Sequence, residues 1–371
     1  MHVCIDYRPA LREGTGVGTY VHGLLAGLGR CHPEADYSAF SASWRDRLAL
    51  PHDLAGVRAV DAKVPVRLLD RLWHRGHWPP IEHWTGPLDI AHSPSPLLIP
   101  ARLARTVITI HDCYFLREPE AVSGVVRRDY VPLMRQATRD ADAIVAVSET
   151  TRVELQELLG IPAERVHVTY NGGSEGFSHV AGARDQVASW LGIDRPYVLF
   201  VGRRELRKDM PTLLRGFAEV GERFTDLQLV LVGPGGDGWA ETWSAVPPAV
   251  AGRVHIVEHQ PAERLATLYS GAQMLALPSL WEGFGLTAIE AMACDTPVIA
   301  ARAGALPEIL GDAAEWFEVG SAEALANGIA RLLEDTARRE ELIVHGRDQA
   351  ARYTWDHTAR LTYELYKKLG A

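Results

Sequence analysis

A strand–helix–strand unit stands out at residues 273–301, QMLALPSLWEGFGLTAIEAMACDTPVIAA. QMLALPS is a short apolar run that ends in turn residues, as is typical of a buried strand, and PVIAA repeats that pattern. The residues between them predict a helix over 286–293. Two such strands around a helix predict a parallel βαβ unit, and the loop after its first strand carries Glu282.

The same alternation extends over both halves of the chain. Short apolar runs are followed by amphipathic stretches that predict helices near 19–30, 127–139 and 212–224. The apolar runs are HVCID (2–6), DIAHS (89–93), TVITIHD (106–112), AIVAVS (143–148), YVLFVG (197–202), LQLVLVG (227–233) and RVHIVE (253–258). Strands that alternate with helices predict an α/β fold with mostly parallel, doubly wound sheets.

The chain is long enough for two such domains. Its 371 residues exceed one ordinary α/β core. The alternation stops at the polar stretch NGGSEGFSHVAGARDQ and then begins again, which places a boundary near residue 177. We therefore expect two Rossmann-like domains that face a central cleft, residues 1–177 and residues 178–354.

The last segment predicts an amphipathic helix. Thr358, Leu361, Leu365 and Leu369 recur at helical spacing within residues 355–371. We group this helix with the first domain, although its spacing leaves open whether it crosses back there.

Composition excludes several classes of protein. The net charge of −9 and the lack of a concentrated basic face exclude a nucleic-acid binder. The four cysteines form no CxxC pair, which favours buried free thiols in a reducing cytosol. The chain shows no export signal and no apolar run of about 18 residues. These features predict a cytoplasmic location, with peripheral contact at the inner face of the membrane left open.

Two glutamates frame the loop and helix of the βαβ unit. Glu282 follows the strand and Glu290 lies eight residues later, within the predicted helix. The carboxyl ends of parallel strands line the ligand crevice of open α/β sheets. Gly283 and Gly285 allow the backbone to approach a ligand, and the helix that begins near Leu286 points free amides at it. One carboxylate can bind hydroxyls of a transferred sugar and the other those of a ribose.

A cationic turn follows the strand YVLFVG. The sequence VGRRELRKDM places Arg203 and Lys208 where they can hold a diphosphate, the Arg as a bidentate fork and the Lys as a point charge. Such cations can stabilise the negative charge that builds up on a leaving group. With two of them no metal is needed, and no Asp-x-Asp signature or His/Cys cluster offers a metal site.

The first half offers two weaker candidates. EGTGVGTY has the wrong glycine spacing for a dinucleotide fingerprint, yet its Gly16 and Val17 precede a helix and can approach a phosphate. A plain helix-entry turn is an equal alternative. His111, at the end of the strand TVITIHD, can hydrogen-bond a sugar at the same edge of its sheet.

Taken together, these motifs resemble the retaining GT-B glycosyltransferases of family 4. The resemblance rests on 278–293 with VGRRELRKD upstream and GALPEILGDAA downstream, and it covers nearly the whole chain. It implies that Glu282 contacts the donor sugar, that Glu290 holds the ribose, and that Arg203 and Lys208 bind the diphosphate. It also implies a donor-site role for His111, for the loop with Gly16 and Val17, and for Gly283, Phe284, Gly285, Leu286 and Thr287. Asp295 departs from the family, whose members usually have Gly there.

The substrates are predicted less sharply. RRELRKDMPTLL and HSPSPLLIP resemble bacterial enzymes that use GDP-mannose, so we expect mannosyl transfer to a glycan, lipid-linked or small-molecule acceptor, without a metal or other cofactor. A UDP-sugar donor is the alternative. A dehydrogenase is disfavoured by the failed glycine fingerprint, and a non-catalytic sugar-nucleotide sensor remains the distant rival.

An aromatic and basic tract in the first half allows three interpretations. LLDRLWHRGHWPPIEHW contains Trp73, Trp78 and Trp84 among arginines and histidines. Aromatic and basic groups suit the headgroup zone of a membrane, but Pro79 and Pro80 break a long amphipathic helix. Packed structure or an acceptor wall is therefore favoured over membrane insertion.

Overall fold

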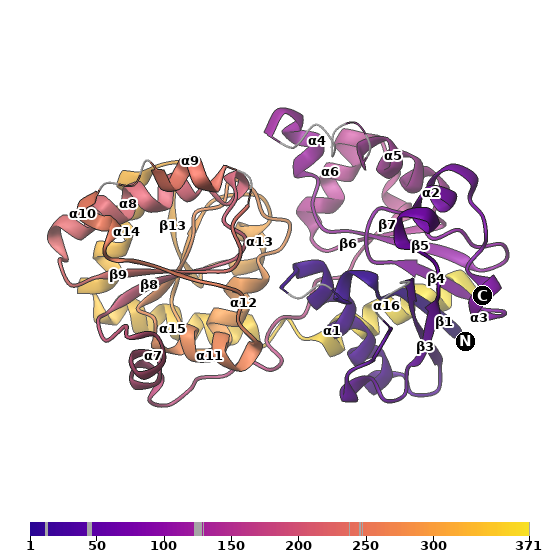
Figure 1. The fold of residues 1–371 in the computed structure, drawn as a ribbon, viewed down its shortest axis with the longest axis horizontal. Coiled ribbons are helices and arrows are strands. Elements are labelled where there is room, and N and C mark those ends of the chain that lie inside the picture. Colours follow the sequence, from indigo (N-terminus) through magenta and orange to yellow (C-terminus); the bar gives the residue numbers. More distant parts are fainter. Residues whose placement is uncertain are drawn as a thin grey trace. The chain divides into compact units, whose positions relative to one another are not determined.

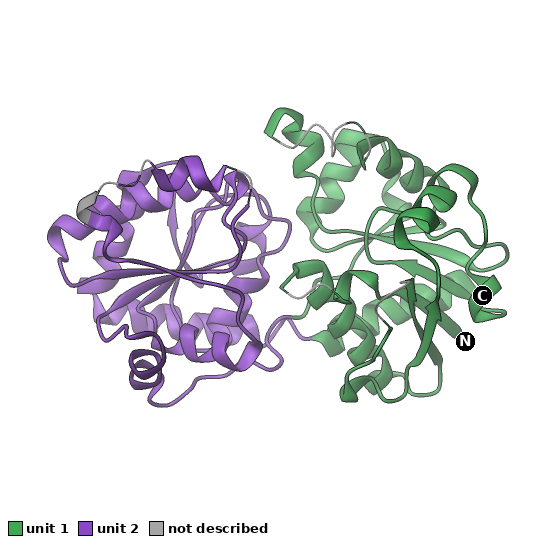
Figure 2. Ribbon diagram, viewed as in Figure 1, with its two compact units in different colours: residues 1–172, 355–371 green, residues 173–354 purple. Residues whose placement is uncertain are grey.

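The chain forms two compact α/β units, which are coloured separately in Figure 2. The computed structural model describes residues 1–11, 14–42, 47–121, 128, 130–236, 238–244, 246 and 248–370. Unit 1 comprises Met1–Gly172 and Trp355–Ala371, and unit 2 comprises Gly173–Thr354. The division thus falls between Gly172 and Gly173, and the boundary expected from the sequence lies at residue 177.

Unit 1 is built on a parallel sheet of seven strands in the order β3-β2-β1-β4-β5-β6-β7 (Figure 1). The apolar runs of the first half form its central strands because a strand covered on both faces needs a continuous apolar sequence. The strands are β1 (His2–Asp6), β2 (Asp36–Ala42), β3 (Arg58–Ala62), β4 (Ile90–Ser93), β5 (Arg105–Ile110), β6 (Ala143–Ala146) and β7 (Val166–Val168).

Helix α1 of unit 1 begins three residues before the start that the sequence predicted and ends one residue later. The long helix α1 begins at Gly16 because the Thr15 side chain caps it, accepting a hydrogen bond from the Gly18 amide at 3.1 Å. The predicted helix at 127–139 begins in residues outside the described part, and α5 continues it. The helices are α1 (Gly16–Cys31), α2 (Val66–Gly76), α3 (Glu82–Thr85), α4 (Tyr114–Arg117), α5 (Val131–Asp140), α6 (Glu149–Leu159) and α16 (Trp355–Gly370).

The C-terminal helix α16 belongs to unit 1 and packs on α1. Trp355 fills the space above Gly23, where an added Cβ would lie 2.2 Å from its indole ring. Thr358 donates a hydrogen bond to the Tyr170 carbonyl at 2.6 Å, and the Tyr366 hydroxyl lies 2.5 Å from His92 Nδ1 under the sheet. The helix therefore crosses back to the first unit, which its spacing had left open.

Unit 2 repeats the plan with six parallel strands in the order β10-β9-β8-β11-β12-β13. The predicted βαβ unit is present, with its helix at α12. The strands are β8 (Tyr197–Val201), β9 (Gln228–Val232), β10 (Val254–Val257), β11 (Met274–Leu277), β12 (Val298–Ala301) and β13 (Ala314–Phe317).

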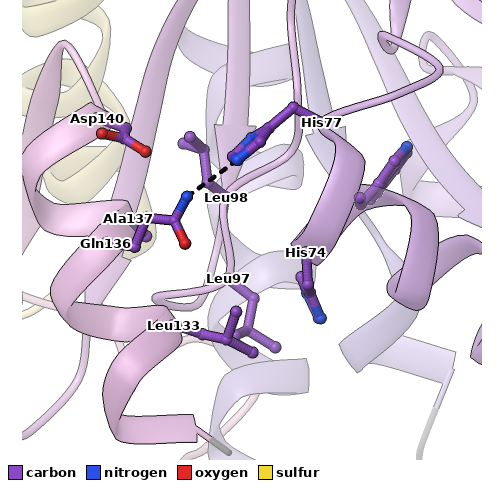
Figure 3. A pocket seen from close by; sticks show the side chains of 9 residues that line it. His74, His77, Leu97, Leu98, Leu133, Gln136, Ala137 and Asp140 are labelled. Carbon is purple, nitrogen blue, oxygen red and sulfur yellow. Dashed lines mark hydrogen bonds between the residues drawn. The ribbon is translucent and has the colours of Figure 1, made fainter.

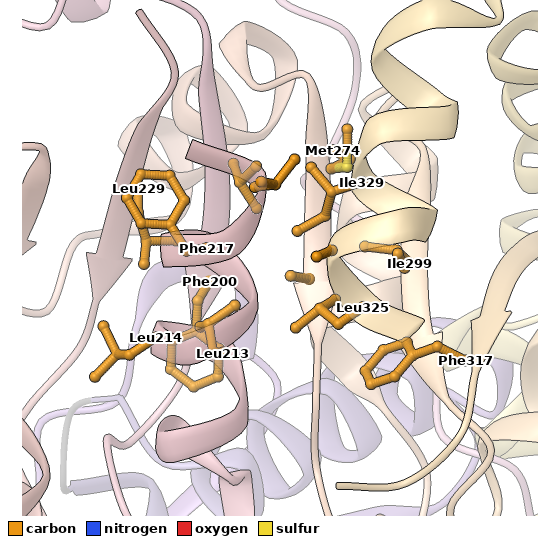
Figure 4. Close-up of a cluster of buried hydrophobic side chains, with 14 of the residues drawn as sticks. Phe200, Leu213, Leu214, Phe217, Leu229, Met274, Ile299, Phe317, Leu325 and Ile329 are labelled. Carbon is orange, nitrogen blue, oxygen red and sulfur yellow. The ribbon is translucent and has the colours of Figure 1, made fainter. Parts of the chain in front are cut away.

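Helices cover both faces of this second sheet (Figure 1). On one face α8 and α14 pack together, with Phe200, Phe217 and Leu325 in a shared apolar core (Figure 4). The helices are α7 (Ala183–Leu191), α8 (Met210–Arg223), α9 (Trp239–Ser244), α10 (Pro248–Ala251), α11 (Ala262–Gly271), α12 (Leu286–Ala293), α13 (Leu306–Leu310), α14 (Ala322–Glu334) and α15 (Thr336–Ala350).

The doubly wound, two-domain fold is confirmed. All four cysteines are free thiols, and Cys4, Cys113 and Cys294 are buried. Within the described residues, every helix is too short or too polar to cross a membrane.

Candidate functional site

The two loops that carry the predicted donor site lie side by side in unit 2. Strands β8 and β11 are neighbours, so the loops that follow them leave the same edge of the sheet together. The Leu280 amide donates a hydrogen bond to the Arg207 carbonyl at 2.9 Å and ties one loop to the other. A short 3₁₀ turn, Leu206–Lys208, folds the first loop toward the second.

Glu282 is the centre of a buried ion-pair network. Lys208 Nζ lies 2.5 Å from Glu282 Oε1, and Arg207 Nη1 lies 3.4 Å from Oε2. The Ser279 hydroxyl donates to Oε1 at 2.5 Å. Only 7% of Glu282 is exposed, so its charge is compensated by these partners rather than by bulk water.

The network fixes Glu282 as a carboxylate. Burial alone would raise its pKa, but the charges of Lys208 and Arg207 outweigh burial and hold the pKa at about 2. Burial lowers the pKa of Lys208 although Glu282 opposes that shift. The loop thus presents a permanently ionised acceptor of hydroxyl hydrogen bonds beside a cation that is poorly solvated.

Arg207 is the network member that the sequence analysis missed. Its Nη1 also donates to the Trp281 carbonyl at 2.9 Å, and its Nη2 lies 3.3 Å from Glu205. It therefore clamps the loop that carries Glu282. Its adjacency to Lys208 in a cationic turn was the available signal, but only the 3₁₀ geometry distinguishes it from the other arginines.

Arg203 and Arg204 have different surroundings. The Arg203 side chain is 58% exposed and lies 3.6 Å from Glu205, so the structure leaves it free of Glu282. Arg204 is buried, hydrogen-bonds the Gly233 carbonyl and lies 5.0 Å from the centroid of the Trp239 ring. Arg204 therefore holds the turn in place, whereas Arg203 presents its guanidinium to solvent.

The backbone around Glu282 depends on glycine at two positions. Gly285 has φ +101° and precedes α12, whose first turn begins at Leu286 and Thr287. At Gly304, with φ +53°, an added Cβ would lie 2.2 Å from the Glu282 carbonyl oxygen. That oxygen also accepts a hydrogen bond from the Ala305 amide at 2.8 Å, so the 303–305 turn fixes the backbone of Glu282.

The remaining predicted loop residues follow Glu282 directly. Gly283 precedes Phe284, which is buried edge-on against the Tyr353 ring. Asp295, two residues after the end of α12, has φ +61° and lies 2.7 Å from Arg347. An ion pair thus accompanies a left-handed conformation that glycine would adopt without strain.

Glu290 occupies a separate, apolar position on α12. Its Oε2 accepts a hydrogen bond from the Tyr269 hydroxyl at 2.7 Å. Burial raises its pKa from 4.5 to about 7, although the Tyr269 hydrogen bond lowers it. The two glutamates of the motif therefore differ in pKa, because Glu282 contacts the cations Lys208 and Arg207 whereas Glu290 contacts the neutral Tyr269 hydroxyl.

His111 and the start of α1 lie in unit 1. The His111 Nε2 donates to the Pro94 carbonyl at 2.9 Å, and burial lowers the pKa of His111 although Pro94 and Asp112 oppose the shift. Within the described residues Nδ1 has no hydrogen-bond partner and is available as an acceptor. Gly16 and Val17 form the first turn of α1, where backbone amides lack intrahelical partners. Their roles toward a donor stay predictions.

A small, partly open pocket lies between α2 and α5 of unit 1 (Figure 3), with free space of about 20 Å³, which is room for about one water molecule. Its apolar walls include Leu97, Leu98 and Leu133, and His77 Nε2 contacts the Gln136 amide at 2.9 Å on its rim. The aromatic tract forms one side. Trp73 is buried and lies 5.4 Å from the Phe40 ring, which agrees with the packed interpretation for that residue.

A metal centre has no obvious ligands here. Among the residues that the structure describes, no group of three or more His, Cys, Asp or Glu side chains could hold an ion.

Both units match known protein families. The family "Glycosyltransferase Family 4" matches residues 14–173, and "Glycosyl transferases group 1" matches residues 188–349. The O-antigen chain mannosyltransferase B of Escherichia coli is 29% identical over 289 residues, 76% of this chain and 74% of that protein. The D-inositol 3-phosphate glycosyltransferase of Rhodococcus erythropolis is 34% identical over 245 residues, 63% of this chain but 55% of that protein.

Solved structures share the fold. Sucrose-phosphate synthase from Thermosynechococcus elongatus has a TM-score of 0.79 at 24% identity and covers 100% of this chain and 99% of its own. Anabaena HepE in complex with UDP-glucose has a TM-score of 0.72 at 18% identity and covers 99% of this chain and 100% of its own. With both family matches in sequence order on this fold, the chain belongs to the GT-B glycosyltransferases, with a family 4 domain followed by a group 1 domain.

Proposed function

We propose that this glycosyltransferase transfers a hexose, and specifically mannose from GDP-mannose, to a glycan, glycolipid or small-molecule acceptor with retention of anomeric configuration. The similarity to an O-antigen chain mannosyltransferase over 74% of that protein supports the mannosyl donor. The runner-up donor is a UDP-hexose, which the fold shared with UDP-glucose-bound HepE favours.

The observation that carries the proposal is the contact between Lys208 and Glu282. A diphosphate that approaches this turn offers Lys208 a stronger anionic partner, and Arg207 remains beside Glu282 to keep it ionised. In the proposed site Lys208 and Arg203 bind the diphosphate, and Glu282 accepts hydrogen bonds from the sugar hydroxyls. The cations stabilise the negative charge that develops as the sugar–phosphate bond breaks.

The other proposed contacts follow the same chemistry. The first amides of α12, from Leu286 and Thr287, point toward the phosphates, with the backbone of Gly283, Phe284 and Gly285 beside them. Glu290, with a pKa of about 7, binds ribose hydroxyls and exchanges its Tyr269 partner for them. No divalent cation takes part in this proposal.

We extend the proposal to the acceptor and to location. The small pocket between α2 and α5 contacts one end group of the acceptor, because it combines apolar walls with a rim of His77 and Gln136. The enzyme is cytoplasmic and makes peripheral contact with a membrane.

Thermal-shift measurements with GDP-mannose, GDP-glucose, UDP-glucose and UDP-N-acetylglucosamine test the donor, and slow donor hydrolysis with and without EDTA tests the chemistry. We expect the largest shift with GDP-mannose and hydrolysis that EDTA leaves unchanged. Stabilisation by UDP-sugars alone would favour the runner-up. Binding without any hydrolysis or transfer would favour a non-catalytic sensor, and activity restored only by manganese would overturn the metal-free site.

A further inference from the structure

The outer face of helix α2 in unit 1 carries three arginines that have no partner in the part of the chain that the structure describes. Arg67, Arg71 and Arg75 recur every four residues and are exposed, so they form one row along the helix. Within the described residues none of the three makes a hydrogen bond or ion pair. Three exposed arginines that form no ion pair among the described residues create a local positive field on a chain whose net charge is −9.

Asp70, the acidic residue of the same helix, offsets at most one of the three positive charges, because it shares the Arg8 guanidinium with Asp6. Asp70 lies 2.8 Å from Nη1 of Arg8, which also binds Asp6. The Arg8 guanidinium therefore engages the Asp70 carboxylate from within unit 1. Lys63, just before the helix, is exposed and adds to the positive face.

Large apolar side chains lie beside the arginines. Leu68 is 49% exposed and Trp78, just after the helix, is 64% exposed. The opposite face of α2 packs into unit 1 through Leu69 and Trp73, which are almost fully buried. Packing of the helix therefore leaves Leu68 and Trp78 outside the core.

We infer that the outer face of α2, made of Arg67, Leu68, Arg71, Arg75 and Trp78, docks on an anionic lipid surface. Arginines bind lipid phosphates, and an exposed tryptophan with a leucine enters the boundary between headgroups and acyl chains. A nucleic acid would match the charge but leave the apolar pair in water. The inference rests on the proposed membrane contact and assigns it to one face; it is independent of the donor site.

Co-sedimentation with vesicles tests this face. The full chain is mixed with vesicles of phosphatidylcholine alone or of phosphatidylcholine with phosphatidylglycerol, at low and high salt. We expect binding only to the anionic vesicles, weakened by salt because exposed charges are screened. Each arginine contributes about fivefold to affinity, so Arg67→Glu, Arg71→Glu and Arg75→Glu together lower it by about 100-fold or more. Trp78→Ala also weakens binding, and by the same factor at low and high salt, because its contribution is apolar.

A matched variant controls for net charge. Arg184→Glu, Arg264→Glu and Arg352→Glu change the same number of exposed arginines in unit 2 and should retain vesicle binding. Unchanged far-UV circular dichroism and unchanged donor hydrolysis in solution show that the α2 variant is folded. The inference is overturned if both triple variants lose vesicle binding equally, or if the wild-type chain does not bind anionic vesicles. Donor hydrolysis is measured without vesicles, so a failed transferase proposal is seen separately.

Discussion

Lys208 Nζ lies 2.5 Å from Oε1 of Glu282, so the proposed diphosphate ligand and the proposed sugar ligand are direct partners. Two loops distant in sequence are joined by this ion pair, and each group sets the charge state of the other. A donor that binds Lys208 must therefore compete with a buried carboxylate. Loss of either partner leaves the other charge buried and uncompensated.

Replacing Lys208 should remove most of the activity. We expect Lys208→Ala to lower kcat by about 100- to 1,000-fold, because the leaving diphosphate loses its buried cation. Lys208→Arg, which keeps the charge with a different shape, should retain part of the rate. Single-turnover kinetics with saturating donor checks this, and near-wild-type turnover of the alanine variant would remove the assigned role.

Arg207 should act by positioning Glu282. In Arg207→Gln the pKa of Glu282 rises, so the acid limb of the kcat profile moves to higher pH and kcat falls by about tenfold. Arg207→Lys should restore the acid limb, because the charge returns, but only part of the rate, because the fork to Trp281 is lost. A merely structural role would leave both variants with the wild-type pH profile.

Glu290 should make stability depend on pH near neutrality. Its pKa is raised from 4.5 to about 7 by burial, so the folded chain binds the proton more tightly than the unfolded chain. The resulting stabilisation is complete below about pH 4.5 and is lost as pH rises to about 7, a difference of about 3 kcal/mol. Glu290→Gln should abolish this slope in chemical denaturation and weaken donor binding. An unchanged slope would contradict the assignment.

The sequence predicted the fold well because parallel strands covered on both faces must be continuous apolar runs. Helix α12 was predicted at its observed bounds, since a strand and a glycine-containing loop define its start. The pairing of Lys208 with Glu282 could not be predicted locally, because it depends on β8 and β11 being neighbours in the sheet. Spacing also could not separate Arg207, which lies in the network, from Arg203, which is exposed beside Glu205.

The aromatic tract shows the same limit. Its three tryptophans look equivalent in the sequence, but Trp73 is buried and Trp78 is exposed. Trp73 lies on the buried face of α2, whereas Trp78 follows the end of that helix at Gly76, and spacing alone does not locate this end. Both the packed interpretation and the surface interpretation thus find residues that fit them.

Gly304 should be intolerant of a side chain. Gly304→Ala combines a left-handed φ of +53° with a Cβ 2.2 Å from the Glu282 carbonyl oxygen. We expect Gly304→Ala to lower the free energy of unfolding by about 1–3 kcal/mol. Its kcat should fall more than that of a control variant, because Glu282 is displaced. Gly320→Ala is the matched control, since Gly320 also has a positive φ of +77° but open space around it. Equal kcat values in the two variants would show that the turn does not position Glu282.

Filling the pocket between α2 and α5 should affect the acceptor alone. Leu133→Trp places a large ring among Leu97, Leu98 and Gln136, so an acceptor group can no longer enter. We expect a raised KM for acceptor with unchanged donor hydrolysis, because Lys208 and Glu282 lie in unit 2. Leu103→Trp, at a leucine that is 84% exposed, controls for added aromatic surface. If Leu133→Trp slows donor hydrolysis as much as transfer, the variant has disturbed the fold, and its melting temperature will show it. If transfer keeps its wild-type acceptor KM, the acceptor binds elsewhere.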